Sequence, residues 1–281
     1  MNFFNKARKK YFVNFMSDSL QQLHILVTRP DPAGQSLCDY LDAHGARTLH
    51  FPTIAFAPPD DTQALQQAIG QLGEQDWIIF NSPQAVYDSV ALIRAAWPQF
   101  PPSVQFAAVG AGTARALHAA GYIVAVHPAD EWSSEGVLDL PEFTHVVGKK
   151  IAIVRGEGGR LLLEKTLKTR EAQVTPVIAY KRILPSVDMT KIITKLKQDP
   201  VNVAICTSYE GVRNLKEMFG EAGWPLIGSL PLIVMSRRII LLARELGFQT
   251  LWLAENASHA AILKTLADKK DEICQQRQLK Q

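Results

Sequence analysis

Short apolar runs alternate with amphipathic segments along most of the chain. Residues 24–28 form the first run, and apolar positions then recur at helical spacing up to about His44, where Gly45 is placed to end a helix. We expect Asp31 to be the N-cap of this helix, with Pro32 at its first position. A second strand is expected over residues 48–56. The alternation of strands and helices predicts an α/β fold.

This series of elements occurs twice. Ile25-Leu26-Val27-Thr28-Arg29 is matched 126 positions later by Ile151-Ala152-Ile153-Val154-Arg155. The same offset relates two further features: Asn81-Ser82 with Thr207-Ser208, each ending a strand, and Gly121 with Gly247, each ending a helix. Residues 52–56 resemble residues 176–180 at an offset of 124. The repeat predicts two similar halves of about five strands, each a parallel, flavodoxin-like sheet, with a boundary near Lys149.

The ligand site of such a fold follows from its topology. Ligands bind beyond the carboxyl ends of the parallel strands, where helix N-termini present unpaired N–H groups and a positive dipole end. Two facing halves would place six strand-to-helix turns around one cleft. These turns are residues 28–31, 81–83, 110–113, 155–160, 207–209 and 235–237.

Composition narrows the class of protein. The chain has 281 residues, of which 47% are hydrophobic and 20% charged, which excludes a disordered protein and indicates about two domains. The formal net charge of +3 reflects Lys6, Arg8, Lys9 and Lys10, which precede the first acidic residue. Aromatic residues interleave with this cluster, as in arms that bind membranes or nucleic acid, but we expect residues 1–20 to be a disordered extension.

Other sequence signals concern the compartment. No stretch of 18 apolar residues and no secretory signal is found, so neither a membrane span nor a membrane partner is expected. Cys38, Cys206 and Cys274 form no CxxC pair, so neither a disulfide framework nor a zinc site is expected. A cytoplasmic protein without a nucleic-acid partner is the prediction.

The strand-to-helix turns are rich in Ser, Thr and Gly, and several arginines lie near them in the sequence. Such a set suits a ligand with several carboxylates or phosphates. The arginines are Arg29, Arg155, Arg160, Arg182, Arg237 and Arg238. An alternative interpretation is that the hydroxyls of Ser82, Thr207 and Ser236 act only as helix N-caps.

Known catalytic motifs are missing from the sequence. The segment 155–160 lacks the lysine and hydroxyl of a phosphate-binding loop, so a flexible backbone cradle for a carboxylate, flanked by Arg155 and Arg160, is preferred to a nucleotide site. The seven histidines are scattered, and neither HExxH nor GxSxG is present. Glu157 and Asp130 are isolated acids, and Cys206 is expected to be a small core residue. No metal site is therefore predicted.

Tyr180 is the one candidate for proton transfer. We expect it to end a strand over residues 174–180 and to leave the core where the chain passes between the halves, because Lys181-Arg182 follows. It is either an amphipathic aromatic side chain at a domain junction or a phenol that donates a proton to a leaving group.

In their order and spacing, several of these segments resemble the uroporphyrinogen-III synthase family over about residues 23–268. The segments are Ile25-Leu26-Val27-Thr28-Arg29-Pro30, Phe51-Pro52-Thr53-Ile54, Phe80-Asn81-Ser82-Pro83-Gln84-Ala85-Val86, Ala108-Val109-Gly110-Ala111-Gly112-Thr113-Ala114, Arg155-Gly156-Glu157-Gly158-Gly159-Arg160 and Val177-Ile178-Ala179-Tyr180. The resemblance implies a monomeric, cofactor-free enzyme that closes hydroxymethylbilane to uroporphyrinogen III, with inversion of ring D and loss of water. It implies that an azafulvene and a spiro-pyrrolenine precede the product, and that positioning is the main catalytic contribution.

The resemblance also implies a different division of the chain. One lobe would contain residues 21–53 and 183–281, the other residues 54–182, and two crossing strands would lie near residues 53–58 and 177–182.

The family's site positions can be transferred to this sequence. Tyr180 would be catalytic, and the substrate-binding residues would be Arg29, Ser82, Thr113, Arg155, Gly156, Ser208 and Ser236. One departure concerns residues 234–238, where many relatives have a Gly-x-Thr turn; here Ser236 would supply the hydroxyl, and Arg237 or Arg238 would add charge.

Two other functions share the predicted architecture. A non-catalytic two-lobed binding or sensor protein would need neither Tyr180 nor chemistry at the site. A glycosyltransferase of two α/β lobes would normally show an acidic or histidine base and a nucleotide-sugar loop, which the sequence lacks.

Overall fold

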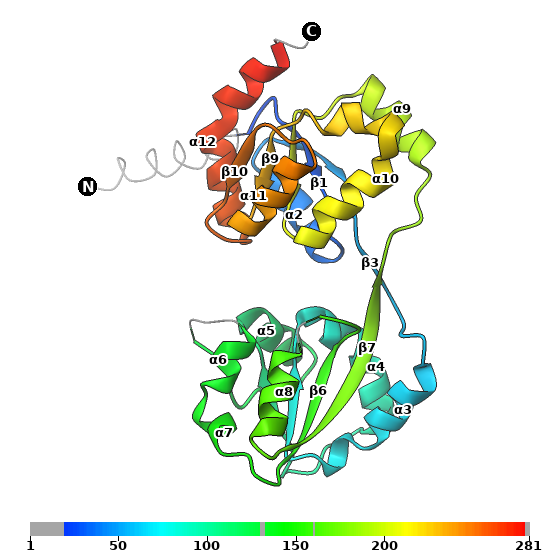
Figure 1. The fold of residues 1–281 in the computed structure, drawn as a ribbon, viewed down its shortest axis with the longest axis vertical. Coiled ribbons are helices and arrows are strands. Elements are labelled where there is room, and N and C mark those ends of the chain that lie inside the picture. The colour runs from blue at the N-terminus through cyan, green and yellow to red at the C-terminus, as the bar shows by residue number, and fades with distance from the viewer. Residues whose placement is uncertain (1–19, 130–132, 160, 279–281) are drawn as a thin grey trace, which may run out of the picture. The chain divides into compact units, whose positions relative to one another are not determined.

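The structure is a computed structural model that describes residues 20–129, 133–159 and 161–278 (Figure 1). The described chain forms two compact units. Unit 1 contains the described residues up to Ala55 and those from Leu184 onward, and unit 2 is Phe56–Ile183. Most of the extension expected over residues 1–20 lies outside the described ranges. The expectation is wrong at Leu20, which is fully buried and donates its amide to the His44 carbonyl at 3.0 Å.

Unit 1 is a five-stranded sheet of order β10-β9-β8-β1-β2, and every pairing in it is parallel. Its strands are β1 (His24–Val27), β2 (Arg47–His50), β8 (Val203–Cys206), β9 (Leu232–Val234) and β10 (Leu251–Leu253). Its helices are α2 (Ala33–Asp42), α9 (Met189–Gln198), α10 (Tyr209–Ile227), α11 (Arg237–Glu245) and α12 (His259–Gln278).

Alternate residues of the unit 1 strands enter two different core clusters. Ile25 packs with residues of α2 and α12, whereas Leu26 packs with residues of α9, α10 and α11. Both faces of the sheet are therefore covered by helices, as a parallel sheet requires.

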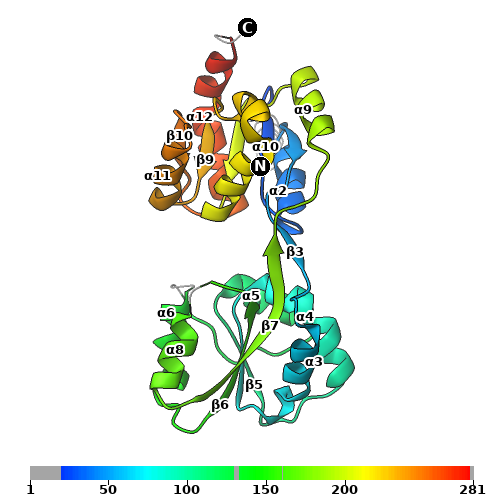
Figure 2. The same ribbon diagram turned by 45° about the vertical axis from the view of Figure 1, so that its right-hand side comes forward.

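Unit 2 is a second five-stranded sheet, of order β3-β7-β6-β4-β5. Its strands are β3 (Ala55–Ala57), β4 (Trp77–Phe80), β5 (Gln105–Ala108), β6 (Lys150–Gly156) and β7 (Gln173–Ile183). Its helices are α3 (Thr62–Gly70), the 3-10 helix η1 (Leu72–Glu74), α4 (Pro83–Ala96), α5 (Ala111–Ala119), α6 (Ser134–Leu138), α7 (Pro141–Thr144) and α8 (Leu162–Thr169). Figure 2 shows α8 on one side of this sheet and α3 and α4 on the other.

The two sheets are built alike, but each combines strands from both repeats. In unit 1, Ile25 pairs with Val203, and 126 positions away from each, Ile151 pairs with Trp77 in unit 2. The first two strands of one repeat thus join the later strands of the other. The expectation of two similar parallel α/β halves is confirmed. The boundary near Lys149 is wrong, because β6 begins at Lys150 and pairs with β4 of the preceding repeat.

The local predictions hold at most turns. Gly45, Gly121 and Gly247 each follow a helix with a positive φ, of 88°, 80° and 103° respectively, so their predicted role as helix ends is confirmed. The predicted N-cap at Asp31 is wrong. Pro32 occupies the cap position, and the Asp31 carboxylate accepts from the Gln35 amide at 3.4 Å.

The strand predicted over residues 48–56 is interrupted. The structure divides it into β2 and β3, and Thr53 between them donates its amide to the Thr28 carbonyl at 3.2 Å instead of joining a sheet ladder. No helix in the described ranges is both long and apolar enough to cross a membrane.

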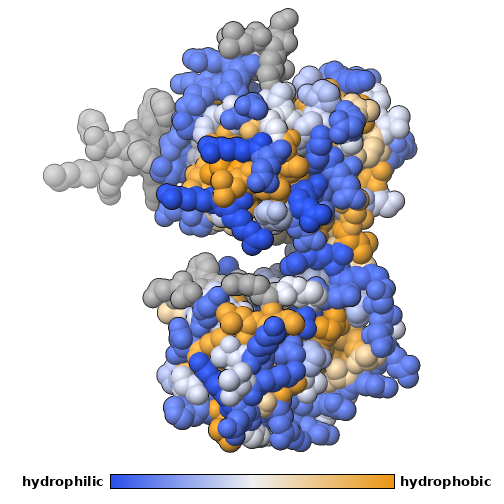
Figure 3. Space-filling view, in the orientation of Figure 1, coloured by the Kyte–Doolittle hydropathy of each residue, from blue (hydrophilic) through white to orange (hydrophobic). Residues whose placement is uncertain are grey.

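Apolar side chains gather on one face of unit 1, over α11 and β10 (Figure 3). Leu241 of α11 and Leu253 of β10 are 61% and 46% exposed. Strand β10 is an edge strand, which pairs only with β9. The edge is short, as edge strands of natural sheets commonly are.

Candidate functional site

Ser82 and Tyr180 meet at the carboxyl end of the unit 2 sheet. The Ser82 hydroxyl lies 3.2 Å from the Tyr180 hydroxyl and also accepts the Ala85 amide at 3.1 Å as the N-cap of α4. The same oxygen therefore fixes the first turn of a helix and the position of a phenol. Pro83 at the start of α4 has no N–H and the Ala85 amide donates to Ser82, so the Gln84 amide is the group of this first turn that suits an anion.

Tyr180 occupies a space left by Gly156. A β-carbon on Gly156 would lie 2.5 Å from Cε2 and Cζ of the Tyr180 ring, so only glycine permits this packing. Phe56 meets the same ring edge-on, with centroids 5.2 Å apart. Tyr180 is 4% exposed and belongs to a core cluster. The expectation that it ends its strand and leaves the core is wrong, because β7 continues to Ile183.

Arg155 is directed toward its own loop. Its Nη1 donates to the carbonyls of Gly156 at 3.1 Å and Gly158 at 3.2 Å, and Nη2 lies 3.4 Å from Oε2 of Glu164. Lys168 and Arg155 both lower the pKa of the Glu164 carboxyl, Lys168 by the larger effect. The Arg155 guanidinium thus holds the loop after β6. Arg160 and Asp130 lie outside the described residues.

Thr113 lies in the first turn of α5 and is 4% exposed. The residue in the cap position is Gly110, which has no side chain with which to cap the helix. Ser236, the cap of α11, stands 126 positions after Gly110, whereas the counterpart of Thr113 is the buried Ile239. In the repeat Ser236 thus corresponds to Gly110, and its hydroxyl caps α11; its role toward a substrate stays a prediction.

In unit 1, Arg29 follows β1. Its Nη1 donates to the Ala257 carbonyl at 3.2 Å, and burial lowers the pKa of the guanidinium. The ring nitrogen Nε2 of His50 donates to the Arg29 carbonyl at 2.8 Å. A β-carbon on Gly34 would lie 2.1 Å from this carbonyl oxygen and 2.2 Å from the His50 nitrogen, so Gly34 makes the turn possible.

Ser208 and Ser236 cap α10 and α11. The Ser208 hydroxyl accepts the Gly211 amide at 3.0 Å, and the Ser236 hydroxyl accepts the Ile239 amide at 3.4 Å. The caps predicted at Ser82 and Ser236 are confirmed. The cap predicted at Thr207 is wrong, because Ser208 is the residue whose hydroxyl faces the helix.

The remaining arginine candidates are exposed. Arg237 and Arg238 lie on the first turn of α11, with the guanidinium carbon of Arg238 4.7 Å from the centroid of the Tyr209 ring. Arg182 lies on the exposed end of β7. Among the described residues, no group of three or more His, Cys, Asp or Glu side chains could hold a metal ion. Cys206 is 1% exposed, which confirms its core role, and burial raises the pKa of its thiol.

Sequence reasoning missed residues whose role depends on contacts distant along the chain. Ser258 caps α12, since its hydroxyl accepts the Ala261 amide at 3.2 Å, and the adjacent Ala257 is the partner of Arg29. The sequence did offer one sign of this N-cap, a serine shortly before the apolar residues 261–263. His50 and Gly34 gave no local signal, because they act through the backbone of a turn formed by other residues.

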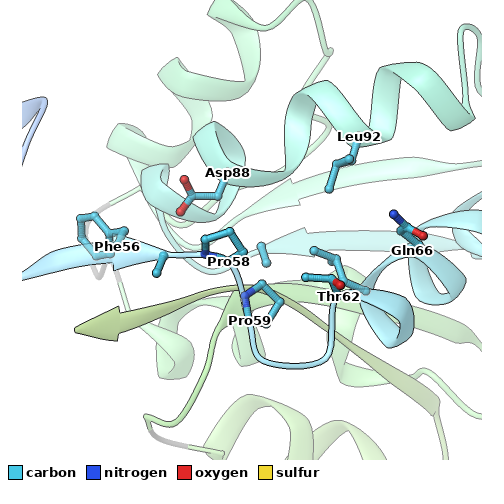
Figure 4. A pocket seen from close by; sticks show the side chains of 10 residues that line it. Phe56, Pro58, Pro59, Thr62, Gln66, Asp88 and Leu92 are labelled. Carbon is cyan, nitrogen blue, oxygen red and sulfur yellow. The ribbon is translucent and has the colours of Figure 1, made fainter.

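A small pocket lies within unit 2, between the end of β3 and the helices α3 and α4 (Figure 4). It has a volume of about 300 Å³ and is bounded by Phe56 of β3 and the two prolines after it, Pro58 and Pro59, by Thr62 and Gln66 of α3, and by Asp88 and Leu92 of α4. Burial raises the pKa of the Asp88 carboxyl, an effect that the Gln84 amide opposes by donating to Oδ2 at 2.8 Å. Phe56 is the residue that contacts both this pocket and the Tyr180 ring.

Together, the fold and these turns define a protein of two flavodoxin-like α/β units whose strand ends present capped helix N-termini and, in unit 2, a fixed phenol. Comparison with protein families gives the particular family. Residues 35–264 match the family model described as uroporphyrinogen-III synthase HemD. The chain belongs to the uroporphyrinogen-III synthase family.

Several curated relatives carry the name uroporphyrinogen-III synthase. The protein of Escherichia coli (strain K12) is 34% identical over 250 residues, which cover 87% of this chain and 100% of that protein. The protein of Salmonella typhimurium (strain LT2) is 33% identical over 247 residues, with coverage of 87% and 100%.

Solved structures support the fold. The uroporphyrinogen-III synthetase of Helicobacter pylori 26695 has a TM-score of 0.54 at 15% identity and covers 87% of this chain and 97% of that one. A mutant uroporphyrinogen III synthase of the extremely thermophilic bacterium Thermus thermophilus has a TM-score of 0.53 at 16% identity, with coverage of 90% and 99%.

Proposed function

We propose that this chain closes hydroxymethylbilane to uroporphyrinogen III, with inversion of ring D and loss of water, and is therefore a lyase. The proposal is supported by membership of the family and by 34% identity to a named synthase over that protein's whole length. The observation that carries the chemistry is the Ser82–Tyr180 hydroxyl pair, 3.2 Å apart at the N-terminus of α4.

Tyr180 acts as the proton donor in this proposal. Its phenol gives a proton to the substrate hydroxyl as the carbon–oxygen bond breaks, and water leaves. The phenolate then recovers a proton from the pyrrole N–H, which leaves a neutral azafulvene. Ser82 orients the phenol, and Gly156 lets the ring lie against the backbone. The other contribution of the enzyme is to hold the flexible bilane in the geometry that closes it to the type III isomer.

The substrate carboxylates are assigned to the turns. The helix N-termini at Ser82, Ser208 and Ser236 each keep N–H groups without a helical partner, which suits them to carboxylates. Thr113 and the backbone at Gly156 add contacts in unit 2. Arg155 serves there by holding the loop, and Arg29 supplies a cation in unit 1.

We further propose that the enzyme is cytoplasmic, acts as a monomer and uses no cofactor. The described cysteines are free thiols, which accords with a reducing compartment. The chemistry assigned to Tyr180 needs only proton transfer and positioning.

Isomer analysis of the product tests the function. Purified protein, treated with a chelator, is incubated with enzymatically generated hydroxymethylbilane, and the uroporphyrinogens are oxidised and separated. We expect chiefly the type III isomer. Type I alone, formed at the uncatalysed rate, would contradict the enzyme assignment, and binding of the bilane without turnover would identify a non-catalytic binding protein.

A further inference from the structure

A second pocket lies at the opposite end of the unit 2 strands from Ser82. It has a volume of about 610 Å³ and is lined chiefly by Arg94, Trp97, Phe100, Phe106, Tyr122 and Ile123. Phe106 lies near the start of β5, and residues 120–123 follow the end of α5. By contrast, Ser82 and Thr113 follow the carboxyl ends of strands. The pocket therefore belongs to no part of the candidate site.

Aromatic rings form its walls. The rings of Phe106 and Tyr122 stack with centroids 5.0 Å apart, and Phe100 meets Phe106 edge-on at 5.2 Å. Trp97 stacks on Phe100 at 5.6 Å, and its indole N–H donates to the Ile69 carbonyl at 2.8 Å, which fixes the ring. These contacts fix the rings against one another, and the pocket that they border favours an aromatic ligand, because apolar and aromatic side chains line it.

Two polar groups meet at this aromatic surface. Nη2 of Arg94 donates to the Ala120 carbonyl at 2.6 Å, which anchors the guanidinium close to the Tyr122 hydroxyl. The Tyr122 hydroxyl oxygen is buried and makes no hydrogen bond of normal geometry within the described part of the chain. Burial raises the pKa of this phenol, and Arg94 opposes the rise, so Tyr122 keeps its proton at neutral pH and stays a donor.

Phe106 is a core residue, and Trp97, Phe100 and Tyr122 pack against the same core cluster, but core packing does not account for the open pocket beside them. Core side chains leave few voids larger than a water molecule, and buried hydroxyls are nearly always paired. Here an open pocket and an unpaired hydroxyl occur together, and Ile123 is 86% exposed at the same place. An apolar ligand with an acceptor group would cover Ile123 and provide the missing partner of Tyr122.

We infer that this pocket binds a planar aromatic carboxylate. The aromatic body lies against Trp97, Phe100 and Ile123, and the carboxylate accepts from the Arg94 guanidinium and the Tyr122 hydroxyl. Arginine suits a carboxylate because its planar N–H groups match the two oxygens. The site is independent of the proposed synthase reaction, and its occupancy is measured without turnover.

The probe for the test is 2-naphthoate, with the neutral 2-naphthalenemethanol as its matched analogue. Titration calorimetry on the full chain should show saturable binding of the carboxylate at one site. We expect the neutral analogue to bind about tenfold or more weakly, since hydrogen bonds to charged groups are the stronger ones. Nuclear Overhauser effects should connect naphthyl protons with the Trp97 and Phe100 rings.

Variants locate the binding. Arg94→Gln should weaken 2-naphthoate by roughly tenfold or more, and Tyr122→Phe by about threefold to tenfold. Lys165→Gln removes an exposed cation of α8 in the same unit, and Ser82→Ala alters the other end of the sheet; neither should change the affinity. Circular dichroism confirms folding of each variant.

Three outcomes would overturn the inference. They are an absence of saturable binding at millimolar probe, equal affinity for the neutral analogue, and loss of binding in Ser82→Ala but not in Arg94→Gln. The last result would place the carboxylate at the helix N-terminus of the candidate site.

Discussion

At the scale of single residues, Tyr180 combines burial in a core cluster with a hydroxyl that touches Ser82. Tyr180→Phe removes only the hydroxyl, so the fold should persist while kcat falls. A positioned acid typically contributes about 10²–10⁴-fold, and we expect the low end or less, because backbone N–H groups still hold the substrate. Steady-state kinetics with hydroxymethylbilane measures the effect, and Tyr87→Phe, on the exposed side of α4, is the matched control.

The binding residues beside it should behave differently. In the proposed site, Thr113→Ala removes a carboxylate contact that persists from the ground state to the transition state, so KM should rise more than kcat falls. Ser82→Ala removes such a contact and also the partner of the phenol, so KM should rise and kcat should fall as well. Full activity in Tyr180→Phe would remove the phenol from the mechanism and leave positioning of the bilane as the whole of catalysis.

Gly156 gives a second test of the phenol's position. Gly156→Ala would place a methyl group 2.5 Å from the Tyr180 ring, so the ring must move away from Ser82. We expect destabilisation of about 1–3 kcal/mol, as for other overpacked sites, and a loss of kcat at least as large as in Tyr180→Phe. Urea unfolding and kinetics measure the two effects.

The matched control for this substitution is Gly70→Ala, at the end of α3, where an added methyl group meets nothing within 4 Å. It should leave kcat unchanged. Equal kinetics in both alanine variants would show that the ring position does not matter.

His24 makes unit 1 sensitive to acid. It is 5% exposed, and burial lowers its pKa below the ordinary value of 6.5, although Asp199 and the Pro200 carbonyl oppose the shift. In the unfolded chain, His24 binds a proton as the pH falls through its ordinary pKa of 6.5. In the folded chain, it binds a proton only at a lower pH. Stability is therefore full above about pH 6.5 and falls as the pH drops toward the folded pKa.

Thermal unfolding between pH 7.5 and 5.5 measures this dependence. His24→Gln should reduce the fall in Tm over this range, and His118→Gln, which changes an exposed residue of α5, should not. The same pH dependence in His24→Gln as in the unaltered chain would assign the effect to other groups.

At the scale of elements, the capped helices serve both folding and binding. Ser208→Ala should cost about 0.5–2 kcal/mol, as for other N-caps, and should also raise KM, because the cap lies at a candidate carboxylate turn. Asp61 caps α3 by accepting the Ala64 amide at 2.8 Å and lies outside these turns. Asp61→Ala should have a similar cost without a change in KM. Chemical denaturation and kinetics on both variants separate the roles, and a raised KM in both would indicate a general loss of structure.

The sequence predicted elements better than it predicted contacts. Strands, glycine helix ends and the caps at Ser82 and Ser236 follow from local patterns and were found in the structure. The position of Tyr180 was not predictable, because it depends on Gly156, 24 positions earlier, which leaves space for its ring. The direction of the Arg155 side chain likewise depends on a backbone carbonyl of its loop and on Glu164. The hydrophobic pattern of the sequence does not show that these groups lie close to Arg155.

At the scale of the whole molecule, the repeat explains why the sheet partners could not be read from the pattern. Ile25 pairs with Val203 in unit 1 in the same register as Ile151 with Trp77 in unit 2, so the strands of the two repeats are locally equivalent. Pairing of strands within each repeat would bury similar side chains to the observed pairing across the two repeats. The two arrangements differ in how the chain connects the strands, as in domain-swapped proteins, and the hydrophobic pattern does not distinguish them.

This arrangement makes a prediction about fragments. Unit 2 is continuous in sequence, and both of its core clusters and the sheet β3-β7-β6-β4-β5, except Ala55 at the start of β3, lie within it. The fragment 56–183 should therefore fold alone, with dispersed amide resonances and a cooperative thermal transition. The fragment 20–149 has nearly the same length and contains one complete repeat, but its β1 loses β8 and its β4 loses β6. It should lack a cooperative transition, because two central strands each lose a neighbour and expose apolar side chains. A cooperative fold in fragment 20–149 would mean that pairing within one repeat is stable, and that the arrangement across repeats is selected only in the full chain.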